Sequence, residues 1–553
     1  MMYKKKVNKN NRRIVMCGCV LSVLLIITQC FRFSIKPFPN GLNPGLINTL
    51  FFYLFFIILG IIVFIFFLKF TFYQYKSISK FKNSQFRLIY QRNDLIYYFV
   101  CAFAQFLGWG PVFLAYFPGI FAYDVLGQIP MEMGSYNNWH PLAHTLYLKF
   151  FYNILGVNIF RNPNIGIALC TITQMVLFAL LLSNIHLFLR RTNLNLRYRL
   201  FWIIFFMFAP FLSMLSISLT KDVFFTGFFI NVLINICYME LDPYWIQNRK
   251  NLLVFLISVC GMILFRNTAI YIWIIFIIIA TFYWVKYKQY FFPIILVFSL
   301  CLGLLLNNGL LFILKAEKVK YNDAFAVPLQ QIGYVYNNSK NDMEQSLKKR
   351  IKFLIPDIDR FYPYSADYLK PSSKLVKEHF SEYKMVYSKL LLRYPGKMLY
   401  SFMLLNQGYW YLNDKSIVNI YENKPGFGYF LTFTFDGFGV KNTSLFPELK
   451  DFFERQFEYP NYSYQKNPFL FILCSLAIYF WILLFCLFSA IGSKTKIAFL
   501  PLLLVFILIG TVFLGPCVLV RYALPYIISI PIILRITFNG SVKRKERIRY
   551  QKK

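Results

Sequence analysis

The chain has 553 residues, of which 58% are hydrophobic and only 15% are charged, and its formal net charge is +36. A soluble protein of this size carries about 25% charged residues, so the composition excludes an ordinary soluble protein. The net charge does not indicate nucleic-acid binding either, because the bases gather in short stretches between long apolar runs, as the positive-inside rule describes. We therefore predict an all-α polytopic membrane protein.

Apolar runs recur along the chain, and each is long enough to cross the hydrocarbon core of a bilayer. The first run follows the basic stretch "MMYKKKVNKNNRR" with no small-x-small cleavage site after it, which predicts a retained signal-anchor. An even number of spans would place both termini on one side of the membrane. We predict about 12 transmembrane helices: 14–33, 46–72, 96–117, 167–189, 200–219, 223–240, 252–265, 269–285, 293–313, 469–491, 497–516 and 522–538.

The distribution of Lys and Arg predicts which side faces the cytoplasm. Bases crowd the loops on the side of the N-terminus and are sparse in the short loops opposite. Short cytoplasmic loops are enriched in Lys and Arg, so we predict a multi-pass protein of the cell membrane with both termini cytoplasmic. Beyond the first and second spans, the basic stretches on that side are 190–199, 248–250, 286–288, 493–496 and 541–553.

Two longer segments should then lie outside the cytoplasm. The first external loop, 118–166, ends in "PLAHTLYLKFFYNILG", which predicts an interfacial helix with Pro141 at its first position. The second segment, 314–468, should form one mostly helical extracytoplasmic domain between spans 9 and 10. It would separate a transmembrane core, 1–313, from a three-helix transmembrane segment with a basic cytoplasmic tail, 469–553.

The extracytoplasmic domain contains no cysteine, so it should fold without disulfides. The stretches "DMEQSLKKRIKFLI" and "SEYKMVYSKLLLRY" have the apolar spacing of amphipathic helices. A third stretch, 393–412, predicts a helix that returns to the membrane and ends in aromatic residues at headgroup level.

Polar side chains from four separate segments should meet on the outer face. The cations come from three tight turns between spans, and a suitable target for them is an anion at the headgroup level, such as a lipid phosphate. An acid beside that anion could act as a base or orient an incoming hydroxyl. These side chains are Asp124, His140, His144, Lys221, Asp222, Arg266 and Arg521.

Simpler interpretations exist for several of these residues. Lys221 and Arg521 could extend to lipid headgroups. Asp222 could stabilise the start of the sixth span, and Asp124 could cap a helix or lie on the surface. Gln128 follows Asp124 by four residues and shares its face if that stretch is helical.

The two histidines have simpler interpretations as well. His140 precedes a proline and could only close a turn before the helix. His140 and His144 have the i, i+4 spacing of a metal pair, but the sequence offers no local third ligand beyond Asp124. We predict no cofactor; a divalent metal stays open as an alternative, although no motif supports one.

The layout resembles the C-type (GT-C fold) glycosyltransferase superfamily of polytopic membrane proteins, and within it an uncharacterised bacterial branch. "FPGIFAYDVLGQ" followed by "NNWHPLAHT" is similar to the first external loop of that branch. Together with five further segments the resemblance covers most of the chain from about residue 96. These segments are "SLTKDVFF", "LFRNTAIY", "VPLQQIGYV", "FYPYSADYLK" and "NQGYWYL".

The resemblance implies transfer of a sugar from a polyprenyl-phosphate-linked donor to an extracytoplasmic acceptor, such as a cell-envelope glycan, lipid or protein. The catalytic acid of the family maps onto Asp124, and the outer cations would hold the lipid phosphate. Many members carry a paired acidic motif, whereas Val125 follows Asp124 here, which puts metal ligation in doubt. In the extracytoplasmic domain, Gln330, Gln331 and Tyr364 are predicted to contact the acceptor, because the region is rich in tyrosines that stack on sugar rings.

Three other functions remain open from the sequence. A transporter or flippase of lipid-linked saccharides would use the same outer cations, but it would also require polar groups along the bilayer and often an internal repeat. A polysaccharide polymerase or ligase combines a similar number of spans with one large external loop. Membrane-bound O-acyl transfer would use His140 or His144 as the base, although its acyl donor usually comes from the cytoplasmic side.

Overall fold

The computed structural model describes most of the chain, and every structural statement below refers to the described part. The predicted basic tail 541–553 lies outside the described residues. Those residues are 2–34, 46–80, 88–133, 135–319, 323–414, 429–430, 432–433 and 437–539.

The all-α membrane fold is confirmed. The described residues contain ten helices long and apolar enough to cross a membrane. A further pair, α7 (Leu196–Phe208) and α8 (Pro210–Ser216), makes an eleventh if it is counted as one bent span. The ten are α1 (Met2–Ser34), α2 (Leu46–Lys80), α3 (Asp94–Ala115), α6 (Pro163–Arg191), α9 (Lys221–Leu241), α11 (Ala269–Lys286), α12 (Phe291–Ile313), α21 (Leu476–Ser493), α22 (Phe499–Phe513) and α23 (Val520–Asn539).

Three of the twelve predicted spans differ from simple transmembrane helices. The predicted tenth span, 469–491, is interrupted at Ser475, between α20 (Pro468–Cys474) and α21. The predicted fifth span is the pair α7 and α8, which bends by 53° at Ala209. Pro210 cannot donate a backbone hydrogen bond and disfavours helical geometry in the residue before it, so the helix breaks there. The predicted seventh span is α10 (Arg249–Phe265), which has only 17 residues and packs between α9 and α12.

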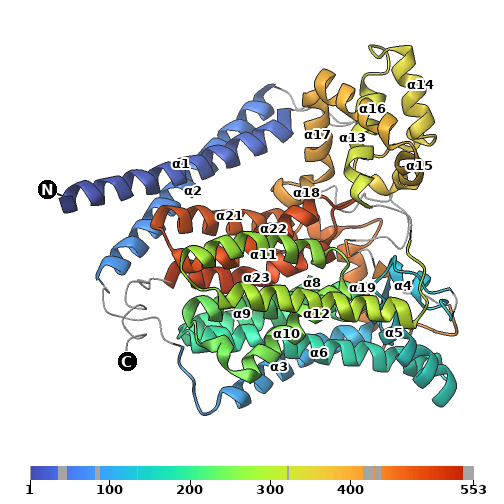
Figure 1. Ribbon diagram of the computed structural model, residues 1–553, viewed down its shortest axis with the longest axis horizontal. Helices are drawn as coiled ribbons and strands as arrows, with labels where there is room; N and C mark the ends of the chain where they lie inside the picture. Colours follow the sequence, from blue (N-terminus) through green and yellow to red (C-terminus); the bar gives the residue numbers. More distant parts are fainter. Residues whose placement is uncertain are drawn as a thin grey trace.

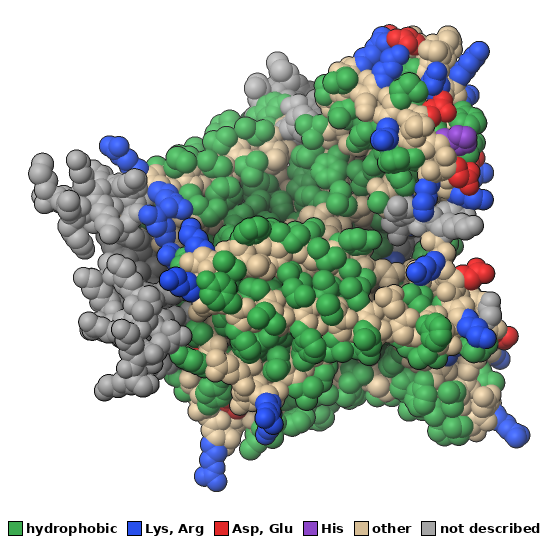
Figure 2. Space-filling model, in the orientation of Figure 1, with side chains coloured by type: hydrophobic (Ala, Val, Ile, Leu, Met, Phe, Trp, Pro, Cys, Tyr) green, Lys and Arg blue, Asp and Glu red, His purple; other side chains and the backbone are tan. Residues whose placement is uncertain are grey.

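The spans run side by side, with α9 and α23 buried most completely among them (Figure 1). The α1 and α2 helices form a hairpin that packs on α21 at the edge of this bundle. Hydrophobic side chains cover the flank of the bundle, whereas Lys and Arg side chains lie toward its two ends (Figure 2). This is the distribution expected of a protein surrounded by lipid.

The first loop contains the predicted helix as α5 (Leu142–Lys149), which continues as the π-helix η1 (Phe150–Ile159). It begins one residue later than expected, so Pro141 is the N-cap residue rather than the first helical residue. The η1 helix packs closely on α6, and the glycine at position 166 permits this approach. A Cβ atom there would lie only 2.6 Å from the carbonyl oxygen of Phe151.

A small sheet that the sequence did not predict orders the start of this loop. The central strand β1 (Ile120–Ala122) pairs in parallel with β2 (Ser218–Leu219) and antiparallel with β3 (Thr432–Phe433). The two parallel strands each lead directly into a helix, β1 into α4 (Tyr123–Gln128) and β2 into α9. The first turns of these two helices therefore lie next to each other.

A helical region follows α12 and lies beyond the end of the bundle opposite the N-terminus (Figure 1). The two predicted amphipathic helices are α14 and α16, and they share one apolar core with α13 and α17. The predicted helix 393–412 is divided into α17 and α18. The helices of this region are α13 (Ala326–Asn338), α14 (Gln345–Leu354), α15 (Ser373–Glu378), α16 (Phe380–Arg393), α17 (Pro395–Leu405) and α18 (Gln407–Trp410). The later helix α19 (Pro447–Phe457) packs on α3 of the bundle instead.

The region contacts the bundle through α18, which packs on α21. The indole nitrogen of Trp481 and the amide of Gln29 both donate to the carbonyl oxygen of Trp410, at 2.8 and 3.0 Å. The chain enters α21 through α20 (Pro468–Cys474). Short 3-10 turns complete the fold: η2 (Trp245–Gln247), η3 (Asp323–Phe325), η4 (Ile358–Arg360), η5 (Ala366–Tyr368), η6 (Lys370–Ser372), η8 (Ser463–Gln465) and η9 (Lys496–Ala498).

Candidate functional site

Asp124, in the first turn of α4, is the meeting point of three of the predicted site residues. Its Oδ2 atom lies 2.8 Å from Lys221 Nζ and 3.5 Å from Arg521 Nη1. The Nδ1 atom of His140 is 3.9 Å from the same oxygen. The pairing of β1 with β2 explains the first contact, since Asp124 and Lys221 both follow the ends of parallel strands.

A second carboxylate, Asp222, faces the same cations from the first turn of α9. Its Oδ1 atom lies 3.2 Å from Arg266 Nη1, and its Oδ2 atom lies 3.6 Å from Arg521 Nε. Asp222 is only 1% exposed, and Thr220 is the N-cap residue of this helix. Arg521 therefore bridges the two carboxylates.

Arg266 follows the last turn of α10 and is held by aromatic rings. Its guanidinium carbon lies 4.9 Å from the ring centre of Phe225 and 5.0 Å from that of Tyr522. Its Nε atom donates to the Thr268 hydroxyl at 3.0 Å. Cation–π contacts of this kind stabilise a desolvated guanidinium, which explains how a charge is tolerated at the end of a short helix.

These five residues, Asp124, Lys221, Asp222, Arg266 and Arg521, are called the cationic cluster below. Three cations face two carboxylates, so the cluster carries an excess of one positive charge. The Arg521 side chain is only 6% exposed, and its buried Nε and Nη1 atoms make no hydrogen bond to any described residue. Both nitrogens face carboxylates, at 3.5 and 3.6 Å, but these ion pairs are too long or too poorly aligned to be hydrogen bonds. An anion that accepted from Arg521 would supply a hydrogen bond and neutralise the excess positive charge.

His140 is a neutral donor at the edge of the cluster. The Lys221 ammonium lies 2.9 Å from His140 Nδ1, and because an ammonium group can only donate, the ring proton must be on Nε2. Burial and the nearby Lys221 charge lower the pKa of His140 to about 4. A charged His140 is therefore excluded at neutral pH.

His144 lies behind the cluster and contacts Gln128. The Nδ1 atom of His144 is 3.0 Å from Gln128 Oε1, and Gln128 Nε2 donates to the Thr145 hydroxyl at 2.9 Å. His144 Nδ1 must therefore carry the proton, which leaves Nε2 as a buried acceptor with no hydrogen-bond partner among the described residues. Burial lowers the pKa of His144 to about 3.

Asp124 is ionised but weakly basic in this arrangement. Burial alone would raise the pKa of its carboxyl group, but the charges of Arg521 and Lys221 outweigh burial and hold the pKa well below the ordinary value. An incoming anion that contacted these cations would weaken their hold on Asp124 and raise its basicity.

The lowered pKa of His144 predicts acid sensitivity. The unfolded chain would bind a proton at about pH 6.5 and the folded chain only at about 3, so stability falls as the pH drops below 6.5. Between pH 7 and 5 this residue should cost about 2 kcal/mol of unfolding free energy. In melting experiments His144→Gln should therefore lose less stability over this range than the wild type. His379→Gln, on the exposed surface of α16's N-terminus, should behave like the wild type.

The two predicted glutamines of the helical region are hydrogen-bonded within that region. Gln330 Nε2 donates to the carbonyl oxygen of Tyr362 at 2.6 Å. Gln331 Nε2 donates to the carbonyl oxygen of Met398 at 3.1 Å, and its Oε1 atom accepts from Tyr387 at 2.7 Å. Both side chains thus join segments of the helical region to one another.

Tyr364 belongs to a segment that touches the loop before Arg521. Its ring packs against Tyr362, with the ring centres 5.8 Å apart. Two residues later, Ala366 N donates to the carbonyl oxygen of Pro516 at 2.7 Å. The segment therefore approaches the cluster, which the sequence separation alone could not indicate.

Three side chains near the cluster were absent from the sequence prediction. Tyr522 follows Arg521 directly and could have been found from that adjacency. Lys370 Nζ lies 5.6 Å from the ring centre of Trp139, the neighbour of His140. No sequence signal joins Lys370 to Trp139, since they lie in the helical region and the first loop.

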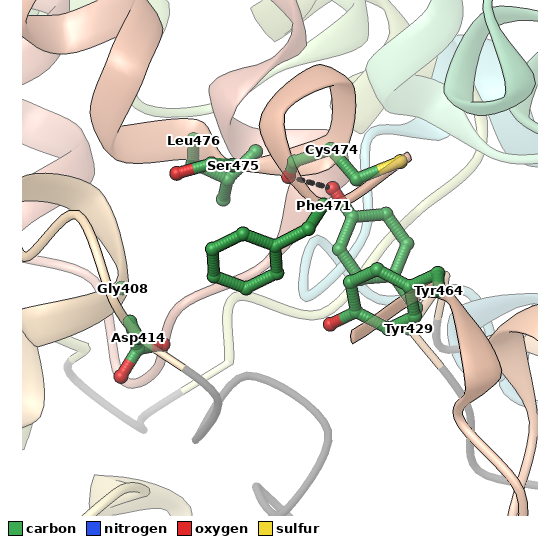
Figure 3. A pocket seen from close by; sticks show the side chains of 8 residues that line it. All are labelled: Gly408, Asp414, Tyr429, Tyr464, Phe471, Cys474, Ser475 and Leu476. Atoms are coloured by element: carbon green, nitrogen blue, oxygen red, sulfur yellow. Dashed lines mark hydrogen bonds between the residues drawn. The ribbon is translucent and has the colours of Figure 1, made fainter. Parts of the chain in front are cut away.

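A small pocket lies apart from the cluster, between α18 and α20 (Figure 3). The Tyr429 hydroxyl donates to the carbonyl oxygen of Cys474 at its edge, at 2.5 Å. None of the cluster residues lines it. Its lining residues are Gly408, Asp414, Tyr429, Tyr464, Phe471, Cys474, Ser475 and Leu476. In the described part of the chain, no group of three His, Cys, Asp or Glu side chains could hold a metal ion.

The fold and the site define a polytopic membrane protein with a buried ion cluster at one end of its bundle. Residues 129–552 match the model of a protein family described as "Family of unknown function (DUF6020)", and the chain belongs to this family. The matched region includes the cluster residues Lys221, Asp222, Arg266 and Arg521 and begins after Asp124. No curated protein and no solved structure matches the chain.

Proposed function

We propose that the chain is a C-type-like membrane glycosyltransferase that moves a sugar from a polyprenyl-phosphate donor to an acceptor outside the cytoplasm. The observation that carries the proposal is Arg521, a buried guanidinium whose Nε and Nη1 atoms form ion pairs but no hydrogen bonds, in a cluster with one excess positive charge. A phosphodiester carries one negative charge and several acceptor oxygens, which matches both properties.

The position of the cluster supports a lipid-linked donor. Its residues begin or follow helices at one end of the bundle, where a lipid headgroup meets water. The preceding loop carries Asp124 followed by α5 and η1, and η1 exposes Phe150, Ile154 and Ile159. Such a helix can lie in the interface beside the donor. In the proposed orientation this end faces away from the cytoplasm.

The reaction assigns a separate task to each charged group. Arg521, Arg266 and Lys221 hold the phosphate oxygens, while the acceptor hydroxyl lies against Asp124. The acceptor oxygen bonds to the anomeric carbon as the bond from that carbon to the phosphate oxygen breaks. The acceptor proton passes to Asp124, and the leaving group departs as polyprenyl phosphate. The phosphate also draws Lys221 away from Asp124, so donor binding itself increases the basicity of the carboxylate.

Transport of a lipid-linked saccharide is a second candidate, and one observation favours it. Asn184 Nδ2 donates to Asn231 Oδ1 at 2.7 Å, and Asn235 donates to the Asn231 carbonyl oxygen at 2.6 Å. These amides lie within α6 and α9 and are largely buried, and polar groups at that depth often mark substrate pathways. They are already hydrogen-bonded, however, so the glycosyltransferase is the better supported function. A polysaccharide polymerase or ligase, a further alternative, would also use a lipid-linked sugar donor, as the glycosyltransferase does.

The proposal is tested with purified protein in lipid nanodiscs supplied with a panel of polyprenyl-phosphate sugars. Glycosyl transfer predicts release of polyprenyl phosphate that depends on Arg521, together with labelled sugar on an added envelope glycan or lipid. The same protein in vesicles measures movement of labelled lipid-linked saccharide between leaflets. Movement without cleavage of any donor would contradict the transferase and support the transporter.

A further inference from the structure

A second group of cations lies at the other end of the same helices. It consists of Arg190 and Arg191 in the last turn of α6, Asp94 at the start of α3, Tyr97 one turn later, and Arg199 in the first turn of α7. These five residues are called the arginine cluster. The α6 helix places it roughly 40 Å from the first loop, at 1.5 Å per residue. It is therefore on the opposite side of the membrane from the cationic cluster.

One carboxylate and one tyrosine ring hold the arginines together. Asp94 accepts Arg191 Nε at 2.8 Å and lies 3.4 Å from Arg190 Nε. The guanidinium carbons of Arg190 and Arg199 lie 4.6 and 5.5 Å from the centre of the Tyr97 ring. Arg190 is fixed further by Gln91, whose Oε1 atom accepts its Nε at 2.9 Å.

The arginine cluster lacks negative charge. Arg190 and Arg191 pair with Asp94, whereas Arg199 has no carboxylate partner among the described residues. The three arginines remain in excess even when Asp242, a carboxylate near Tyr90, is included. Arg190 and Arg191 are favoured at the C-terminus of a helix, but Arg199 lies at the positive N-terminal end of α7. Its Nε atom is buried and makes no hydrogen bond to a described residue. Both features of Arg199 favour the binding of an anion there.

The surroundings indicate that this anion belongs to a lipid. Leu95 beside Asp94 is 67% exposed, and Leu196 and Phe201 on either side of Arg199 are 54% and 55% exposed. In a membrane protein, exposed apolar side chains at a helix end contact acyl chains. A phosphate at Arg199 with its acyl chains on these residues would satisfy the charge and the apolar surface together.

We propose that the arginine cluster binds the headgroup phosphate of an anionic phospholipid in the leaflet on the N-terminal side of the membrane. This site is separate from the sugar-transfer site and does not depend on it. Most basic residues at a cytoplasmic surface contact lipid only loosely, whereas these guanidinium groups are fixed before the lipid arrives. The lipid should therefore remain bound when the protein is extracted from the membrane.

Native mass spectrometry of the full chain, titrated with phosphatidylglycerol in detergent, tests this site. The wild type should retain one phosphatidylglycerol with an affinity on the order of tenfold higher than Arg199→Gln, because a charge-assisted hydrogen bond is lost. Arg197→Gln is the matched control, since Arg197 is exposed and lies two residues away on the same helix. If Arg199→Gln fails to fold, Arg199→Lys removes the Nε donor while keeping the charge.

Two competition experiments, with phosphatidylcholine and with inorganic phosphate, identify the ligand. Phosphatidylcholine should compete poorly, because the headgroup carries no net negative charge. Inorganic phosphate at millimolar concentration should neither be retained nor displace phosphatidylglycerol, and displacement would show that the site takes a free anion instead. Equal retention by the wild type, Arg199→Gln and Arg197→Gln would overturn the proposal. None of these outcomes depends on sugar transfer.

Discussion

Replacing Arg521 with glutamine is expected to weaken the binding of polyprenyl phosphate by at least about thirtyfold, since losing one partner of a desolvated ion pair costs about 2–5 kcal/mol. The reason is geometric: Arg521 Nε and Nη1 are buried donors that form ion pairs but no hydrogen bond with any described residue. The dissociation constant is measured with purified protein in nanodiscs and a fluorescent polyprenyl phosphate.

The variant should still fold, which makes the experiment interpretable. Without Arg521, Asp124 keeps Lys221 at 2.8 Å and Asp222 keeps Arg266 at 3.2 Å, so neither carboxylate is left without a cation. Arg521→Lys should recover only part of the affinity, because it restores the charge but not the planar fork. Arg455→Gln, on the exposed face of α19, should bind like the wild type. Unchanged affinity in Arg521→Gln would show that the phosphate binds elsewhere.

Much of the fold could be predicted because long apolar runs and basic loops respond to the bilayer itself. Two of the spans that differ have local causes. Pro210 divides one of them, and the other, α10, is short because Arg266 ends it. The division of 393–412 at Asn406 also has a local signal, because Asn406, Gln407 and Gly408 interrupt the apolar residues.

The clustering of the charged residues at the turns between spans was also predictable from the positions of the spans. Lys221, Asp222, Arg266 and Arg521 lie at or beside the turns between spans on one side, and the structure gathers them into one cluster in which Lys221 and Arg521 contact Asp124. The contact that aligns Asp124 with Lys221 was not predictable, because strands of two or three residues show no periodic pattern. The acceptor contacts proposed for Gln330 and Gln331 rested on composition, which does not determine which way a helix turns its amides.

Converting Asp124 to asparagine is expected to reduce sugar transfer at least about a hundredfold, the lower limit for loss of a general base. Asparagine keeps the shape of the side chain but cannot take the acceptor proton. It also changes the cationic cluster from one excess positive charge to two. Donor affinity should therefore be unchanged or higher while the turnover rate falls. A residue that only supports the fold would lower both quantities, so the combination identifies a base.

The measurement is single-turnover sugar transfer with saturating polyprenyl-phosphate donor, paired with the donor dissociation constant for the same protein. Asp451→Asn is the matched control, because Asp451 is exposed on α19, and it should leave both quantities unchanged. If Asp124→Asn transfers sugar at the wild-type rate, Asp124 is not the base. Loss of both donor binding and transfer would instead indicate that Asp124 positions Lys221 and Arg521. If the wild type cleaves no donor but moves lipid-linked saccharide between leaflets, the carboxylate belongs to a transport site, and its replacement should then slow that movement.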